Sequence, residues 1–100
     1  MKVQANPKGY ELNGTYRIGY VAATEHMFEA VFGEAHDDDP SEDNKVSKVW
    51  YFETPHGRAS VRNWHTNPVD RLTLASTNRE AAADLAEHIS DCGLVAALEA

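Results

Sequence analysis

Residues 46–64 read VSKVWYFETPHGRASVRNW, and this stretch decides the fold of the chain. Val46, Val49, Trp50, Tyr51 and Phe52 put apolar groups on both faces of this segment, which is typical of a strand that is covered on both sides. The next residues, 54–57, are Thr-Pro-His-Gly and predict a turn, because proline presets φ and glycine tolerates positive φ. Residues 58–65 then alternate between polar and apolar side chains. The stretch therefore predicts two antiparallel strands joined by a short turn.

The pattern continues towards the C-terminus with a third strand and a helix. Asn67-Pro68 interrupts the second strand, and Leu72 and Leu74 alternate with polar neighbours, which completes an antiparallel meander. Asn78 is a typical N-cap, and an apolar stripe with helical spacing follows it as far as Gly93. We expect residues 94–98 to form a short helical tail.

Towards the N-terminus, the sequence predicts a hairpin and a first helix. Asn13-Gly14 favours a tight hairpin turn between residues 10–12 and the alternating run 15–21. Thr24 is a plausible N-cap, and Gly33 is a good helix terminator. The order β-β-α-β-β-β-α predicts an α+β fold, with an antiparallel sheet of about five strands and two helices on one face. We interpret residues 1–100 as a single domain.

Composition narrows the range of functions. The formal net charge is −7, which disfavours direct binding to nucleic acid or to an anionic membrane. The single cysteine, Cys92, excludes an intramolecular disulfide and a cysteine-based zinc cluster. No apolar run approaches the roughly 18 residues that span a bilayer. We therefore expect a cytoplasmic protein that needs no metal and no cofactor.

Residues 34–44 are strongly acidic, and we interpret them as a mobile loop. Their carboxylates belong to Glu34, Asp37, Asp38, Asp39, Glu42 and Asp43. Few apolar side chains are present to offset the entropy of ordering this segment. A contact with a protein partner, a mimic of nucleic acid and a calcium site remain open, although Glu42 stands where a calcium-binding EF-hand loop needs glycine.

The central strands carry a second candidate contact surface. Trp50, Arg58, Arg62 and Trp64 lie on the predicted sheet, and two short helices cover only one of its faces. An aromatic patch left exposed on the other face is a usual mark of a protein interface.

The histidines give only weak evidence for a metal site or a catalytic site. His88 and Cys92 are four residues apart on one helix, but two ligands are too few for a structural zinc site, and Cys92 is expected to be buried on the apolar stripe. His56 and His65 flank the second central strand, and a small metal- or ligand-binding enzyme that uses both is an alternative. No residue stands out as catalytic.

From Phe32 to Asn63, about a third of the chain, the sequence resembles small accessory proteins of bacteriophages. The resemblance rests on Phe-Gly at 32–33, an acidic gap, Asp-Asn-Lys-Val at 43–46, a Trp-bearing strand and a glycine turn, with Ala35 in place of a proline. It implies a phage or prophage setting in which such proteins commonly bind and block a host or defence factor. It implies no particular activity.

These observations favour a non-enzymatic protein-binding module. We expect the contact to involve the acidic loop (Asp37, Asp38, Asp39, Glu42 and Asp43) and the sheet residues Trp50, Arg58, Arg62 and Trp64. The alternatives are the histidine-based enzyme and a structural homodimer held by the aromatic face of the sheet.

Overall fold

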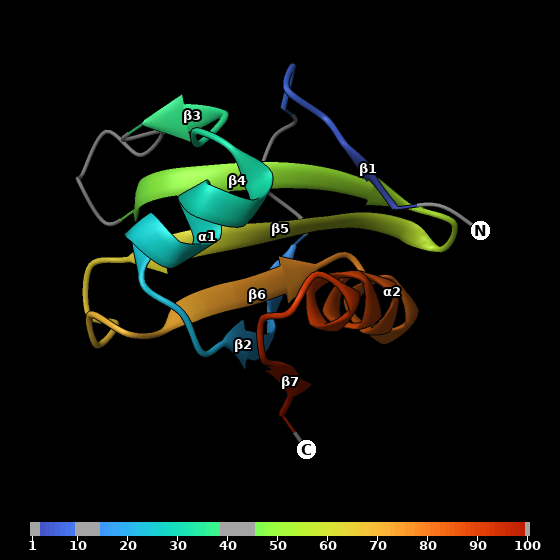
Figure 1. The fold of residues 1–100 in the computed structure, drawn as a ribbon. Helices are drawn as coiled ribbons and strands as arrows, with labels where there is room; N and C mark the ends of the chain where they lie inside the picture. Colours follow the sequence, from blue (N-terminus) through green and yellow to red (C-terminus); the bar gives the residue numbers. More distant parts are fainter. Residues whose placement is uncertain (1–2, 10–14, 39–45, 100) are drawn as a thin grey trace.

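The computed structural model describes residues 3–9, 15–38 and 46–99, and it confirms the α+β class. Two helices and seven strands are found in these ranges (Figure 1). In chain order they are β1 (Gln4–Ala5), β2 (Tyr16–Val21), α1 (Glu25–Phe32), β3 (Asp37–Asp38), β4 (Val46–Thr54), β5 (Gly57–Trp64), β6 (Leu72–Ser76), α2 (Arg79–Asp91) and β7 (Ala96–Leu98).

The strands form one antiparallel sheet in the order β1-β4-β5-β6-β2-β7, and β3 also pairs with β4. The predicted meander of β4, β5 and β6 is confirmed. The register of β4 and β5 runs from Val46 opposite Trp64 to Thr54 opposite Gly57, so the turn lies where the sequence predicts it. The chain thus passes from β1, beside β4, to β2, beyond β6.

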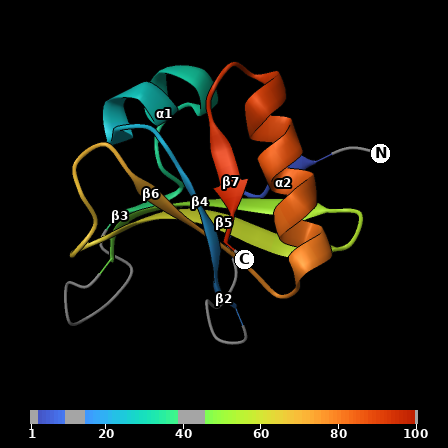
Figure 2. The same ribbon diagram turned by 90° about the horizontal axis from the view of Figure 1, so that it is seen from below.

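Both helices lie on the same face of the sheet, as predicted (Figure 2). The main core forms between them and that face. Its fully or almost fully buried members include Phe28, Trp50, Phe52, Val61, Leu72, Leu74, Leu85 and Ile89. Neither described helix has the length and apolar character needed to cross a membrane.

The two predicted helix caps are confirmed. The Thr24 hydroxyl accepts from the amide of Met27 at 3.0 Å, and the Asn78 side chain accepts from the amide of Ala81 at 2.8 Å. Each bond satisfies one backbone donor that the first helical turn leaves without a partner. Gly33 ends α1 with a positive φ of 86°.

The C-terminal tail is a strand, so the prediction of a helix over residues 94–98 is wrong. Gly93 has a φ of 94° and turns the chain back along β2. The amide of Ala22 donates to the carbonyl of Val95 at 2.8 Å, and the amide of Glu99 donates to the carbonyl of Ile18 at 2.7 Å. Pairing with the edge of β2 therefore outweighs the local helix propensity of the alanine-rich tail.

Cys92 is exposed, so its predicted burial is also wrong. It is the C-cap of α2, one residue beyond the last helical residue. The apolar stripe ends with Ile89, which is fully buried.

The acidic segment is in part ordered. Asp37 and Asp38 form β3 and pair with Val49 and Lys48, so the predicted loop does not extend over these two positions. Residues 39–44 lie outside the described residues, as do residues 10–14 with the predicted Asn13-Gly14 turn. Residues 4–5, expected to be irregular, form β1 on β4.

Candidate functional site

Trp50 lies in the core and not on a contact surface, so this part of the predicted site is wrong. Its side chain is fully buried, its ring packs edge-on against Phe28 at 4.8 Å, and its indole N–H donates to the carbonyl of Gly33 at 2.9 Å. Because β4 carries apolar side chains on both of its faces, its sequence does not show which face the helices cover. Here they cover the Trp50 face.

On the opposite face of the sheet, called the second face below, two central side chains are buried. Val49 is fully buried, and only 4% of Tyr51 is exposed, so the expected exposed aromatic patch is absent from these two positions. The N-terminal segment contributes to this cover, because a Cβ added to Gly9 would lie 3.0 Å from the ring of Tyr51. The ring of His36 stacks on Tyr51 with 6.2 Å between centroids. Trp64 packs against Val49 and Tyr51 but remains half-exposed.

Asp37 is engaged within the fold. The Tyr51 hydroxyl donates to its carboxylate at 3.2 Å. Burial and the neighbouring Asp37 carboxylate raise the pKa of Tyr51 to about 12, while Arg62 acts in the opposite direction. Asp38 lies in β3, and Asp39, Glu42 and Asp43 lie outside the described residues. The acidic half of the predicted contact therefore stays a prediction.

Arg58 and Arg62 share the second face but belong to different surroundings. Arg62 donates from Nε to the Ser60 hydroxyl at 3.1 Å, and its guanidinium also donates to the Thr15 hydroxyl. Arg58 is exposed and forms an ion pair with Glu53 at 3.8 Å. At a rise of about 3.3 Å per residue, their Cα atoms are roughly 13 Å apart along β5.

A pocket opens beside Arg62 and Trp64 at the end of β5. It has a volume of about 320 Å³ and is lined by Arg17, Arg62, Trp64, Thr66, Asn67 and Thr73. We call it the arginine–tryptophan pocket. Among the described residues, six line it, of which two are arginines and none is a carboxylate. Its side chains offer N–H and O–H donors and one large aromatic surface.

Hydrogen bonds in the loop after β5 hold one wall of this pocket in place. The amide of Asn67 donates to the carbonyl of Trp64 at 2.9 Å and closes a turn. The Asn67 side chain then donates to the Thr73 hydroxyl, also at 2.9 Å. A second turn follows, in which the amide of Arg71 donates to the carbonyl of Pro68 at 3.1 Å.

Two further hollows adjoin the pocket. Trp64 and Asn67 also line a hollow of about 570 Å³, together with Thr24, Glu25, His26, Asn63, His65 and Val69. On the other side, a hollow of about 180 Å³ shares Arg17 and Thr73 with the pocket and adds Arg71, Tyr20 and Glu99. The Arg71 guanidinium lies 4.2 Å from the centroid of the Tyr20 ring. Three of the five arginines in the sequence, Arg17, Arg62 and Arg71, thus gather at this end of the sheet.

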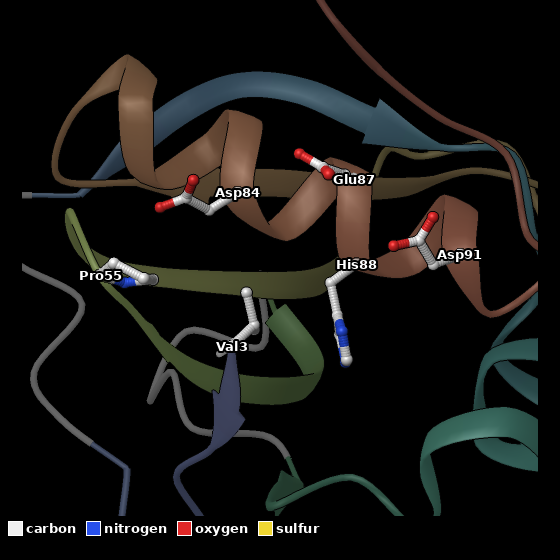
Figure 3. Close-up of a pocket in the computed structure, with 6 residues that line it drawn as sticks. All are labelled: Val3, Pro55, Asp84, Glu87, His88 and Asp91. Carbon is white, nitrogen blue, oxygen red and sulfur yellow. The ribbon is translucent and has the colours of Figure 1, made fainter. Parts of the chain in front are cut away.

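A smaller pocket of different character lies between α2, the N-terminal segment and the β4–β5 turn (Figure 3). Its volume is about 140 Å³, and it is lined by Val3, Pro55, Asp84, Glu87, His88 and Asp91. At its rim, His56 Nδ1 lies 2.7 Å from Asp84 Oδ2, which ties the turn to α2. The described residues contain no group of three or more His, Cys, Asp or Glu arranged to hold a metal ion. The pocket is small, and the carboxylates of Asp84, Glu87 and Asp91 would repel an anionic ligand. Its volume and charge do not indicate a particular ligand.

The predicted pair of histidines does not form one site. His56 lies in the turn before β5 and His65 directly after its last residue, so the whole strand separates them. Eight strand residues span roughly 26 Å. The two side chains of one chain therefore do not meet in one reaction site.

No protein-family model matches the chain, and no curated protein or solved structure is significantly similar to it. The geometry of the pocket is thus the basis for a functional argument. Sequence reasoning identified Arg62 and Trp64 but missed Arg17, Thr66, Asn67 and Thr73. The available signals were the outward position of Arg17 in an alternating strand and the turn at Asn67-Pro68.

Proposed function

We propose that this chain is a non-enzymatic protein-binding module whose contact surface is centred on the arginine–tryptophan pocket. The observation that supports this proposal is a half-exposed Trp64 beside Arg17 and Arg62 in a concave, ordered site. Tryptophan and arginine are the residue types most enriched among energetically dominant interface residues. A pocket that holds them in place lets a partner bury one anchoring side chain.

The biological setting of the module follows from the resemblance to bacteriophage accessory proteins. We propose that its partner is a protein of the bacterial host or of a defence system. The net charge of −7 supports a protein partner over nucleic acid, whose phosphates the chain would repel.

A pull-down from bacterial lysate tests this function, with a matched pair of charge reversals. Arg17→Glu changes a pocket residue, whereas Arg79→Glu makes the same change on α2, outside the pocket. Both arginines contact Glu99, Arg17 through an ion pair at 3.6 Å and Arg79 through a hydrogen bond to its carbonyl at 2.8 Å. We expect a partner that the wild type and Arg79→Glu retain and that Arg17→Glu loses. Equal retention by both variants would contradict the proposed surface.

A homodimer is the second candidate, and the surface of α1 supports it. Met27 and Val31 are four residues apart on this helix, with 45% and 42% of their surfaces exposed. Side chains at this spacing lie on one helical face. Sedimentation velocity of the wild type and of a Met27→Lys/Val31→Lys variant tests it: a dimer that the double substitution dissociates would support self-association through α1, and a monomeric wild type would exclude it.

A further inference from the structure

We infer that His36, which directly precedes β3, is a pH-sensitive switch whose protonation releases β3 from the edge of β4. The switch lies outside the arginine–tryptophan pocket and does not depend on the proposed function. Two short strands share this edge of β4: β1 pairs with residues 52–53, and β3 pairs with residues 48–49 (Figure 1). The backbone N–H and C=O of Tyr51 face the junction between the two short strands.

A histidine ring nitrogen takes the place of a backbone carbonyl at this junction. On the β1 side, the amide of Asn6 donates to the carbonyl of Tyr51 at 2.8 Å. On the β3 side, the amide of Tyr51 donates to Nδ1 of His36 at 2.9 Å, and the amide of His36 donates to the carbonyl of Val49 at 3.0 Å. A backbone amide only donates, so Nδ1 is the unprotonated nitrogen, and the neutral ring carries its proton on Nε2.

Protonation of His36 removes this acceptor. Both ring nitrogens of an imidazolium are donors, so Nδ1–H of the charged ring would face the N–H of Tyr51. The ring also stacks on Tyr51, with 12° between the planes, and its centroid lies 6.3 Å from that of Phe52. Burial lowers the pKa of His36 below the ordinary value of 6.5. The paired arrangement is therefore favoured above pH 6.5, and release is favoured as the pH falls below that value, because the released ring binds a proton more readily.

Several other ionisable side chains lie on the strands of this edge. β1 has none, and those on β3 and β4 are Asp37, Asp38, Lys48, Tyr51 and Glu53. Tyr51 has a pKa of about 12 and stays neutral. Lys48 forms an ion pair with Glu29 at 3.7 Å, and Glu53 forms one with Arg58 at 3.8 Å. Asp37 accepts from the Tyr51 hydroxyl at 3.2 Å, so its effect has to be separated from that of His36.

β3 is an element that a small change at one contact is able to release. It is a two-residue strand at the edge of the sheet, whereas β4, β5 and β6 pair with one another over several residues. Short edge elements open with a smaller free energy than central strands do. Release frees the carboxylate of Asp37 from Tyr51 and uncovers the side of the Tyr51 ring on which His36 stacks. A carboxylate and an aromatic ring thus become available together at acidic pH.

Hydrogen exchange of backbone amides, measured by NMR on the full chain, tests the switch. Uptake of one proton changes the opening equilibrium by at most about tenfold per pH unit. Between about pH 7.5 and about pH 5.5, we therefore expect the protection of the Tyr51 amide to fall several-fold, with a limit of about tenfold. Amides of the central strand β5 should keep their protection. Nitrogen chemical shifts of the His36 ring should show a proton on Nε2 at neutral pH and protonation of Nδ1 as the protection of Tyr51 falls.

Three matched substitutions separate His36 from its neighbours. His36→Asn supplies a side-chain oxygen that accepts from the Tyr51 amide and does not titrate, so the protection of Tyr51 should no longer depend on pH. His56→Asn makes the same change at the histidine that pairs with Asp84, and it should leave the transition as it is in the wild type. Asp37→Asn removes the nearby carboxylate but keeps an acceptor for the Tyr51 hydroxyl, and it should also retain the transition.

Four results would overturn the assignment. They are a protection of Tyr51 that does not change with pH in the wild type, a transition that persists in His36→Asn, a proton on Nδ1 at neutral pH, and an equal loss of protection throughout β5, which would show global unfolding. The wild-type measurements decide the question even where the His36 variant does not fold.

Discussion

The two tryptophans of the chain should respond in opposite ways to the same substitution. Trp50 is fully buried and donates a hydrogen bond to Gly33, whereas Trp64 is half-exposed at the pocket. In Trp50→Phe, the smaller ring leaves a cavity of roughly 40 Å³, which costs about 1 kcal/mol at ~24 cal/mol per Å³. Loss of the indole N–H from a carbonyl in a partly buried position adds about 1 kcal/mol. We therefore expect Trp50→Phe to lower the free energy of unfolding by about 2 kcal/mol.

Trp64→Phe should cost less than Trp50→Phe, because Trp64 is only partly buried and lines two open pockets. It should instead weaken capture of the lysate partner. Urea denaturation followed by circular dichroism measures both free energies, and the lysate pull-down measures how much partner is retained. A cost for Trp64→Phe that equals the cost for Trp50→Phe, or unchanged retention of the partner by Trp64→Phe, would refute this division of roles.

Three further predictions concern the fold around the site. A Cβ added in Gly19→Ala would lie 2.2 Å from the carbonyl oxygen of Ala97, so β7 must shift, and urea denaturation should show a loss of about 1–3 kcal/mol. Burial lowers the pKa of His36 below 6.5, and its Nδ1 accepts from the amide of Tyr51 at 2.9 Å. His36 therefore binds a proton more readily in the unfolded state than in the folded state. The stability that neutral His36 contributes is complete above pH 6.5 and is lost as the pH falls below that value. His36→Asn should flatten the plot of unfolding free energy against pH in this range. Tyr51 has a pKa of about 12, so spectrophotometric titration should show one tyrosine ionising well above the ordinary value of 10, and Asp37→Asn should lower its pKa.

Local sequence patterns predicted the parts of the fold that local forces determine. Strands β4, β5 and β6 follow one another through short turns, and both helices begin at side chains that cap their first turns. The two-residue strands β1 and β3 carry no periodic pattern, because two residues are too few to alternate. Strand β7 was missed because its conformation is set by the edge of β2, more than seventy residues away in the sequence.

The sequence predicted only those pocket residues that lie together on one strand. Arg62 and Trp64 are two residues apart on β5, so their shared face follows from strand geometry. Arg17 joins them because β2 pairs with β6, and that pairing brings together segments more than fifty residues apart. Side-chain alternation gives the face of each strand but not the order of strands in the sheet. Sequence reasoning therefore found two of the six described lining residues and assigned Trp50 to the wrong face.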